Sequence, residues 1–452
     1  MTPTTDPVTQ DSRVLIVGYG LHGQAVATAL CARSIAARVV DDRPGEAASA
    51  HAVQLGVELI ACPDNDALTA AVAAATHVVP TPGLPDHHSL FGVATELGRA
   101  IVSEFDLAAE WDHRPLVAIT GTNGKTTVTT MVTEMLVGSG INAVMAGNME
   151  VPLVTAIDDH EPEVFVVEAS SFRLGHSSRF APLVGTWLNL EPDHLDVHAS
   201  LTAYESAKAR IWANQSNAGL AIGNAEDPIV MASLPGRDSD ITFGGSTATA
   251  RVADGQLIIA GELICAVSDL ARSLPHDISN ALAAAATAIA AGAEHSAVRE
   301  VLESFGGLEH RVQLVADQAG IRWYNDSKAT TPHAVMAGVG GFDSAVLIAG
   351  GRNKGVDLTP LRSLASRLRA VVAIGEAAPE IADVFDGLVP VVSAPSMEDA
   401  VRGAGDLARS GDVVVLSPAC TSYDWYANYG VRGDDFMRLV GELLAQGDVV
   451  SS

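Results

Sequence analysis

A glycine-rich turn with one lysine and several hydroxyl groups is the clearest candidate for chemistry in this chain. Residues 120–127 read TGTNGKTT, follow the apolar segment Leu116–Thr120 and precede a helix that we expect at Val128–Val137. Backbone N–H groups, a lysine and a threonine at this spacing are typical of loops that bind the β- and γ-phosphates of ATP with Mg²⁺. Ile119 replaces the first glycine of the strict pattern, but the donors remain. The predicted ATP-binding residues are Gly121, Thr122, Asn123, Gly124, Lys125, Thr126 and Thr127.

Another glycine turn lies nearer the N-terminus. Gly18–Gly23 reads GYGLHG and precedes an apolar helix expected at Gln24–Arg33, and Asp41 and Asp42 follow a further strand at Ala37–Val40. This order is typical of a dinucleotide site, where N–H groups contact a diphosphate and an acidic residue binds a ribose hydroxyl. A different nucleotide, or a turn needed only for helix–strand packing, also fits. A nicotinamide-dependent oxidoreductase is therefore one hypothesis, although it leaves the TGTNGKTT turn unexplained.

Acidic and imidazole groups follow two more apolar strands. Val164–Val167 reads as a buried strand ending at Glu168, and Asp193 and His194 lie in the segment EPDHLDVH. A carboxylate at a strand end near a phosphate turn suits a magnesium ligand. The alternative for Glu168 is a side chain that points to solvent. His194 is either a structural histidine or a metal ligand or orienting group.

Lysine is rare in this chain. Of the 27 basic residues, only Lys125, Lys208, Lys328 and Lys354 are lysines. A bias towards arginine should spare positions where arginine cannot serve, because arginine keeps its proton and its planar group cannot replace a compact point charge. We therefore predict that most of the four lysines are functional. Lys208, in a helix expected at Ala203–Trp212, would otherwise be interpreted as a surface residue.

Alternating strands and helices must position these groups. Strand-like starts at Arg13–Val17, Leu116–Thr120 and Ala345–Ala349 each run into a glycine-bearing turn. This alternation is typical of parallel-sheet α/β domains. Breaks are expected near Ser103–Asp112 and Gly306–Glu309. The predicted domains are residues 1–105, 106–307 and 308–452.

The composition indicates a large folded protein and argues against nucleic-acid and membrane partners. The 452 residues include 54 acidic and 27 basic side chains, and the net charge of −27 repels phosphate backbones. A hydrophobic content of 48% with 18% charged residues excludes disorder. The longest apolar run, Ala281–Ala293, is too short and too rich in alanine to span a membrane. The cysteines are scattered and the first thirteen residues lack a hydrophobic segment, so we expect a cytoplasmic protein.

Two further motifs complete a resemblance to a known family. NDSKAT at Asn325–Thr330 and LSPACTS at Leu416–Ser422, the latter followed by Arg432, Gly433 and Phe436, accompany TGTNGKTT. With these motifs the sequence resembles the Mur ligase superfamily over essentially its whole length, most closely the branch that adds D-glutamate. The resemblance implies an α/β fold with three domains. These are an N-terminal Rossmann-like domain that holds UDP, a central phosphate-loop ATPase domain with a parallel or mixed sheet, and a C-terminal Rossmann-like domain.

The resemblance also implies roles for individual residues, with the first glycine turn holding the UDP of a substrate rather than a dinucleotide. The implied UDP-substrate contacts are Leu21, His22, Asp42, Arg43, Gly83, Asn148 and Ser170. Further ATP contacts are Asn280, Arg311, Asp326 and Lys328. The D-glutamate contacts are Thr330, Lys354, Ser422 and Tyr429. The catalytic residues are Lys125, Glu168, His194 and Lys208, and the metal-binding residues are Thr126, Glu168, His194 and Lys208.

The implied reaction is an ATP-dependent amide ligation in peptidoglycan precursor synthesis. The L-alanine carboxylate of UDP-N-acetylmuramoyl-L-alanine (UDP-MurNAc-L-Ala) attacks the γ-phosphoryl of ATP, and the D-glutamate amine then displaces phosphate from the acyl phosphate. Two Mg²⁺ ions are expected, one on Thr126 and Glu168, the other on His194 and a CO₂-derived carbamate of Lys208. Arginine cannot replace Lys208, because only a deprotonated amine adds CO₂. We expect a monomer that acts on small molecules and needs domain closure to assemble its site.

Four residues depart from the family pattern. Arg173 stands where glutamine is usual, Thr331 and Asp277 where asparagine is usual, and Tyr429 where phenylalanine is usual. Arg173 adds a cation that either strengthens an anionic contact or points away. Two alternatives stay open: a sister amide ligase, such as another muramyl ligase or a folylpolyglutamate synthase, and a non-catalytic nucleotide-binding regulator. The regulator would be expected to have lost a phosphate-binding lysine or a metal-binding carboxylate.

Overall fold

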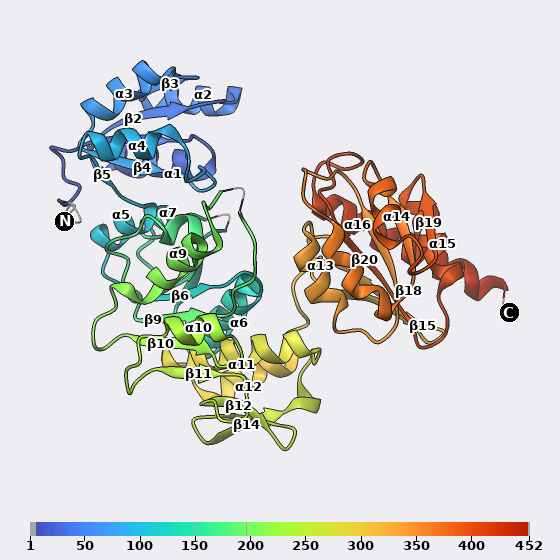
Figure 1. Ribbon diagram of the computed structural model, residues 1–452. Helices are drawn as coiled ribbons and strands as arrows, with labels where there is room; N and C mark the ends of the chain where they lie inside the picture. The colour runs from blue at the N-terminus through green and yellow to red at the C-terminus, as the bar shows by residue number, and fades with distance from the viewer. Residues whose placement is uncertain (1–5, 150, 196, 451–452) are drawn as a thin grey trace. The chain divides into compact units, whose positions relative to one another are not determined.

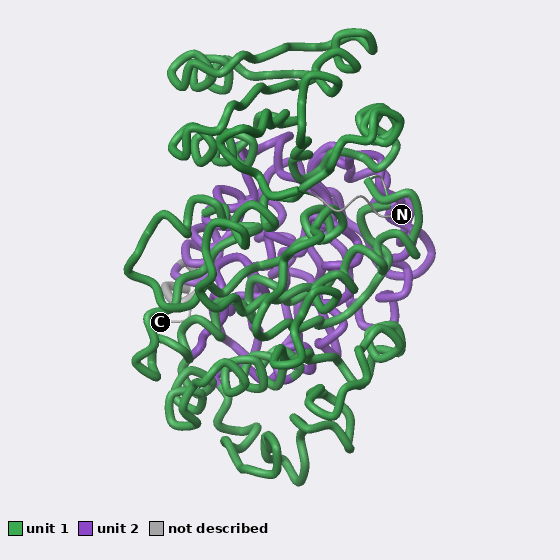
Figure 2. Tube along the Cα trace, turned by 90° about the vertical axis from the view of Figure 1, so that its left-hand side faces the viewer, with its two compact units in different colours: residues 1–270, 279–304 green, residues 271–278, 305–452 purple. Residues whose placement is uncertain are grey.

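The computed structural model describes residues 6–149, 151–195 and 197–450. Two compact units are distinguished (Figure 2): residues 1–270 with 279–304 form the larger, and residues 271–278 with 305–452 form the smaller. Both are built from strands that alternate with helices, as the sequence predicts. No helix within the described ranges is long and apolar enough to cross a membrane.

The first sheet of the larger unit has five parallel strands in the order β3-β2-β1-β4-β5 (Figure 1). The strands are β1 (Arg13–Val17), β2 (Ala36–Asp41), β3 (Glu58–Ala61), β4 (His77–Pro80) and β5 (Ala100–Ile101). The helices are α1 (Leu21–Ala32), α2 (Glu46–Leu55), α3 (Asn65–Ala74) and α4 (Ser89–Glu96). Alternate residues of β1 enter different cores, Val14 and Ile16 with α1, Leu15 and Val17 with α3. The strand order reverses between β1 and β4, which places the first glycine turn at a switch point suited to ligands.

The second sheet of the larger unit has nine strands in the order β14-β13-β12-β11-β10-β9-β6-β8-β7. It is parallel from β7 to β12 and antiparallel beyond. The strands are β6 (Leu116–Thr120), β7 (Ala143–Gly147), β8 (Val164–Glu168), β9 (Val184–Trp187), β10 (Leu220–Asn224), β11 (Ile241–Phe243), β12 (Ala250–Ala253), β13 (Gln256–Ile259) and β14 (Glu262–Ala266). The helices are α5 (Glu104–Trp111), α6 (Lys125–Gly138), α7 (Leu153–Ala156), α8 (Ser171–Leu174), α9 (Leu201–Ala213), α10 (Pro228–Ser233), η1 (Val267–Asp269), α11 (Pro275–Ala290) and α12 (His295–Ser304). The first four residues of α11 belong to the smaller unit. Because β6 lies between β8 and β9, Glu168, the segment after β9 and the turn at residues 120–127 emerge at one edge of the sheet. We call residues 120–127 the phosphate turn, after their predicted ligand.

The smaller unit contains a six-stranded sheet in the order β15-β16-β20-β17-β18-β19, parallel except for β15. The strands are β15 (Gln313–Gln318), β16 (Ile321–Asn325), β17 (Ala345–Gly350), β18 (Leu368–Ile374), β19 (Val391–Ala394) and β20 (Val413–Ala419). The helices are α13 (Pro332–Val339), η2 (Thr359–Arg367), α14 (Ala378–Phe385), α15 (Met397–Leu407) and α16 (Tyr429–Val450). Two cores cover its faces: Leu347 of β17 packs with α13 and α14, and Val346 and Ile348 pack with α15 and α16.

The predicted elements are present, with some ends shifted. Strands β1 and β6 have the expected bounds. Strand β2 is one residue longer than expected at each end, and β8 and β17 are each one residue longer at the C-terminal end. Helix α6 begins at Lys125 rather than Val128, because Gly124 adopts a left-handed φ of +83° that turns the chain directly into the helix. Helix α1 begins at Leu21 rather than Gln24, so part of the glycine turn is already helical. Helix α9 begins at Leu201, where the Ser200 side chain caps it.

The predicted break at residues 103–112 is a capped helix inside the larger unit. Ser103 accepts a hydrogen bond from the N–H of Asp106 at the start of α5, and the next residue, Glu104, forms a buried ion pair with Arg173. One core of buried side chains includes Val14 of the first sheet and Trp212 beside the second. The first two sheets are therefore packed together. A separate domain ending at residue 105, and a boundary at residue 307, stay predictions.

Candidate active site

The phosphate turn lies between β6 and α6 and is fixed by a residue of a neighbouring strand. The N–H groups of Thr122 and Asn123 donate to Oδ1 of Asn189, at 3.0 and 2.9 Å. A Cβ atom at Gly124 would lie 2.5 Å from Oδ1 of Asn280, and the left-handed φ of +83° at this position favours glycine. The structure thus places Asn280, a predicted ATP contact, against the turn. Asn189 was not predicted as a site residue; its signal is a polar residue between two leucines directly after a strand.

Two of the four lysines meet at this turn. Lys125 Nζ donates to the carbonyl oxygens of Gly121 and Thr122, at 2.8 and 2.9 Å, and Lys208 Nζ donates to Gly121 at 2.7 Å. Lys208 is only 1% exposed. Burial and then the positive charge of Lys125 lower the pKa of Lys208 well below its usual value, against the opposing charges of Asp193 and Glu168. The environment therefore favours the neutral amine that carbamate formation requires.

Glu168 ends β8 with one carboxylate oxygen engaged and the other not. The side chain is 4% exposed, and Oε1 accepts a hydrogen bond from Asn148 Nδ2 at 3.0 Å. Oε2 is buried, and no described residue hydrogen-bonds to it; the same is true of Ser170 Oγ, two residues further on. A buried carboxylate oxygen without a donor suits a hard cation such as Mg²⁺. Thr126, the other predicted ligand of this ion, lies in the first turn of α6.

His194 occupies a loop after β9 with a left-handed φ of +55°. Its Nε2 lies 3.5 Å from Asp193 Oδ2, and its ring packs edge-on against Phe172, with 4.8 Å between centroids. Asp196, in the same motif, lies outside the described residues. Among the residues that are described, no three His, Cys, Asp or Glu side chains converge as a metal site. The second predicted magnesium site depends instead on His194 together with a modified Lys208.

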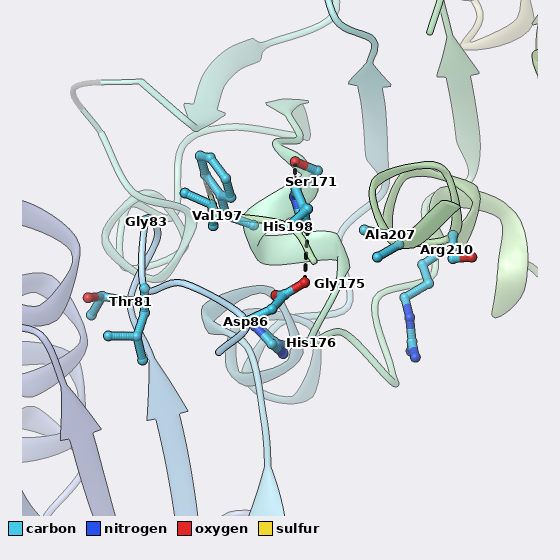
Figure 3. A pocket seen from close by; sticks show the side chains of 14 residues that line it. Thr81, Gly83, Asp86, Ser171, Gly175, His176, Val197, His198, Ala207 and Arg210 are labelled. Atoms are coloured by element: carbon cyan, nitrogen blue, oxygen red, sulfur yellow. Dashed lines mark hydrogen bonds and ion pairs between the residues drawn. The ribbon is translucent and has the colours of Figure 1, made fainter. Parts of the chain in front are cut away.

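A cavity of about 240 Å³ lies beside this loop (Figure 3), lined by residues of the β4–α4 connection, α8, the His194 loop and α9. His198 Nε2 lies 2.9 Å from Ser171 Oγ, and His198 Nδ1 lies 3.5 Å from Asp86 Oδ2. Asp86 also accepts from the N–H of Ala199 and donates its own N–H to the carbonyl of Val197. The predicted UDP contact Gly83 belongs to the lining. Asp86 and His198, neither predicted as a site residue, thus fasten the His194 loop to the first sheet.

The first glycine turn is closed by Asp41 rather than Asp42. The Asp41 carboxylate accepts the N–H groups of Tyr19 and Arg43, whereas the exposed Asp42 side chain lies 3.3 Å from His88 Nε2. Asp42 is therefore the residue of the pair that is accessible to a ribose, as the resemblance implies. Leu21, also predicted to contact the UDP-substrate, is exposed at the start of α1.

Arg173 connects two predicted substrate contacts and does not point away. Its side chain is 2% exposed, and its guanidinium donates to Glu104 Oε2 at 2.7 Å and Asn148 Oδ1 at 3.1 Å. Its Nη2 lies 2.6 and 2.8 Å from the two ring nitrogens of His22. Burial and the Arg173 charge lower the pKa of His22 to about 4, although Glu104 opposes this. His22 is therefore neutral near pH 7.

In the smaller unit, the predicted residues follow the C-terminal ends of β16, β17 and β20, except Arg311, which precedes β15. Asp326 is buried, and Oδ2 accepts from Ser417 Oγ at 2.7 Å. Burial raises the pKa of Asp326 to about 7, against the hydrogen bonds and nearby arginines. Lys328 Nζ lies 5.2 Å above the ring of Tyr429, and Lys354 Nζ lies 5.4 Å above the ring of Tyr423.

Arg432 joins the two C-terminal motifs. It is 1% exposed and donates to Oγ and the carbonyl oxygen of Ser327, at 2.9 and 2.8 Å, and to the carbonyl oxygen of Cys420 at 3.2 Å. Burial lowers its pKa to about 10. Thr330 follows Ser327, and Ser422 follows Cys420, so Arg432 fixes the loops that carry both predicted D-glutamate contacts.

The two remaining departures from the family pattern have local roles. Thr331 caps α13 by accepting from the N–H of Ala334, and Asp277 accepts from Arg272 at 3.0 Å. The predicted site residues thus form two groups. The larger unit carries the phosphate turn, the UDP contacts, the metal residues and Asn280, and the smaller unit carries Arg311, Asp326, Lys328 and the D-glutamate contacts.

Known proteins match this chain in sequence and in fold. The profile described as Mur ligase middle domain matches residues 119–288, and the profile described as Mur ligase, glutamate ligase domain, matches residues 310–420. The chain belongs to the Mur ligase family. The UDP-N-acetylmuramoylalanine–D-glutamate ligase of Frankia casuarinae is 41% identical, covering 94% of this chain and 93% of the relative. The ligase of the same name from Methylococcus capsulatus is 38% identical, covering 96% and 95%.

A solved structure supports the same fold. UDP-N-acetylmuramate-alanine ligase MurC from Thermotoga maritima is 19% identical, with 94% of this chain and 98% of that chain covered and a TM-score of 0.56. At this identity the likeness concerns the fold alone. The predicted Mur ligase fold, with α/β architecture and parallel or mixed sheets, is confirmed.

Proposed function

We propose that this chain is an ATP-dependent ligase that adds D-glutamate to UDP-MurNAc-L-Ala and releases ADP and phosphate. One observation carries the chemistry: Lys125 and Lys208 meet at Gly121, beside a Glu168 carboxylate with one unengaged oxygen. The similarity to D-glutamate ligases over almost the whole chain supports the choice of amino acid. The proposed location is the cytoplasm, and the proposed active form is a monomer.

The residues of the larger unit suit the joining of two anions. The substrate carboxylate must approach the γ-phosphate of ATP, so cations and N–H donors have to offset the repulsion between them. We assign Lys125 to the β- and γ-phosphates, which requires its Nζ to leave the carbonyl oxygens of Gly121 and Thr122. The N-terminus of α6, which follows directly, adds donors to the same anion.

Magnesium fits the residues that the chain provides. Glu168 Oε2 and the Thr126 hydroxyl are proposed to hold one ion, and His194 and a carbamate on Lys208 a second. When bound, these ions supply positive charge that stabilises the transferring phosphoryl group. Burial lowers the pKa of Lys208 and so favours the neutral amine, which supports the carbamate because an ammonium group cannot add CO₂.

D-Glutamate is assigned to the smaller unit, where cations and hydroxyl groups follow adjacent strands. Lys354 supplies a positive charge, Thr330 and Ser422 supply hydroxyl groups, and Tyr429 supplies a ring beside Lys328. These groups match an amino acid with two carboxylates. The UDP moiety is assigned to the first glycine turn with Asp42 and Gly83.

Phosphate release from ATP tests this function directly. The purified chain is incubated with UDP-MurNAc-L-Ala and D-glutamate, L-glutamate, another amino acid or none. Release that requires D-glutamate, and that is lost in Lys125→Ala, is the expected result. Release with a different amino acid would transfer the chain to a sister amide ligase. Tight ATP binding without release under any condition would favour a nucleotide-binding regulator.

A further inference from the structure

Arg173 is a buried arginine whose guanidinium contacts three other side chains. It lies in α8, and its side chain is 2% exposed. Three of its nitrogens meet three partners: Nε meets Glu104, Nη1 meets Asn148 and Nη2 meets His22. A buried guanidinium fixed on three sides has little freedom to rotate.

The contact with Asn148 determines which way that amide points. Arginine only donates hydrogen bonds, so the atom of Asn148 that faces Nη1 must be the amide oxygen. The amide NH₂ group then faces Glu168 and donates to Oε1 at 3.0 Å. If the amide were reversed, its NH₂ group would face the Arg173 guanidinium, another donor. Its oxygen would then face the negatively charged Glu168 carboxylate. Arg173 therefore selects the orientation in which Asn148 holds Glu168.

Glu104 explains why a positive charge is tolerated at this buried position. Its side chain is 4% exposed; Oε2 accepts from Arg173 Nε, and Oε1 accepts from the N–H of Val154. The charges of Glu104 and Arg173 compensate each other, and removal of either side chain would leave the remaining buried charge uncompensated. Glu104 and Arg173 thus form a buried ion pair, and the Arg173 guanidinium of this pair also holds Asn148.

We propose that Arg173 is a positioning residue for the magnesium–nucleotide site: it fixes Asn148, and through Asn148 it holds Glu168 with Oε2 available to a cation. This inference rests on the proposed function, which makes Glu168 a magnesium ligand. Partners that hold a metal-binding carboxylate tune metal affinity without touching the metal. The role belongs to this chain's own pair of Arg173 and Glu104.

The test measures ATP affinity by titration calorimetry, with Mg²⁺ and with EDTA, on the full chain. The quantity of interest is the gain in affinity that Mg²⁺ confers. In the double variant Arg173→Met/Glu104→Gln, which removes both charges and the donor to Asn148, the gain is expected to fall about tenfold, the lower end for losing a partner of a metal ligand. Affinity in EDTA is expected to stay as in the wild type. Thermal unfolding checks that the variant is folded.

A conservative variant separates positioning from packing. Arg173→Gln/Glu104→Gln removes the same charges but keeps an NH₂ donor for Asn148, so the magnesium-dependent gain should recover relative to the methionine variant. Arg179→Lys is the matched control, because Arg179 also pairs with a glutamate, Glu110, in the same unit. It should keep the wild-type gain.

The outcomes separate the inference from the function. A folded methionine variant with the wild-type gain, or two double variants with equal losses, overturns the positioning role while ligation by the wild type still supports the function. Absence of ligation by the wild type overturns the proposed function itself. A magnesium gain in that inactive wild type, lost in the methionine variant and recovered in the glutamine variant, would support the positioning role without ligase activity.

Discussion

Lys125 and Lys208 donate to the same atom, the carbonyl oxygen of Gly121, at 2.8 and 2.7 Å. Two ammonium groups that share one acceptor repel each other, and the more deeply buried of the two is the one whose charge costs more. That residue is Lys208, whose pKa is lowered first by burial and then by Lys125. The turn thus favours the neutral amine of Lys208, beside the lysine to which we assign the phosphates of ATP.

This arrangement predicts that Lys208 carries CO₂ and that arginine cannot replace it. Lys208→Arg is expected to lower the rate of phosphate release by at least about 10²-fold, the scale of losing one electrostatic contact to developing charge. Isotopically labelled CO₂ should give a carbamate signal in the NMR spectrum of the wild type. The signal should increase as the pH rises at constant dissolved CO₂, because the addition of CO₂ to the amine releases a proton.

Lys328→Arg provides the comparison for the carbamate signal, since Lys328 lies in the smaller unit and has no assigned modification. It should leave the signal intact, and Lys208→Arg should remove it. A wild type without the signal, under conditions in which it ligates D-glutamate, would contradict the carbamate.

Asn189 is expected to shape the phosphate turn. Asn189→Ala removes the side-chain oxygen that accepts the N–H groups of both Thr122 and Asn123. The Thr122 N–H keeps the backbone carbonyl of Asn189, at 3.1 Å, so the turn loses one of its restraints. We expect ATP affinity to fall about tenfold, which corresponds to about 1.4 kcal/mol. Calorimetric titration with Mg²⁺-ATP measures the change. Asn214→Ala, at the end of α9, is the control, and equal losses in both variants would refute the specific role.

The sequence predicts most of the fold and the motif residues, but not the side chains that hold them. TGTNGKTT and NDSKAT stand next to apolar strands, so local pattern locates them. Asn189 and Arg432 act on backbone groups far away along the chain, and nothing in their own neighbourhood indicates the partner. The sequence allows two orientations of the Arg173 side chain, because its orientation depends on Glu104, 69 positions earlier. Long-range pairing of buried polar groups is the information that spacing lacks.

The raised pKa of Asp326 predicts that the stability of the protein depends on pH. Its pKa is raised to about 7, mainly by burial, whereas an unfolded aspartate ionises near pH 4. The stability that the protonated group contributes is therefore complete below about pH 4 and lost as the pH rises through about 7. Asp326→Asn mimics the protonated form. The melting temperature of Asp326→Asn minus that of the wild type should thus be more positive at pH 8 than at pH 5.

Asp317→Asn tests whether the effect depends on burial, because Asp317 lies on β15, at the edge of the same sheet. Its melting-temperature difference should not change sign or size in the same way between these pH values. A difference for Asp326→Asn that is constant across the range would rule out the raised pKa.

Arg432 is expected to govern D-glutamate binding without touching it. Arg432→Lys keeps the charge but cannot reach Ser327 and Cys420 together, so the loops carrying Thr330 and Ser422 lose a shared anchor. The KM for D-glutamate should rise about tenfold, or about 1.4 kcal/mol, while the KM for UDP-MurNAc-L-Ala stays unchanged. Arg438→Lys, on the same helix but exposed, should change neither value. A uniform rise in every KM would instead indicate general loss of structure, which thermal unfolding of the variant would reveal.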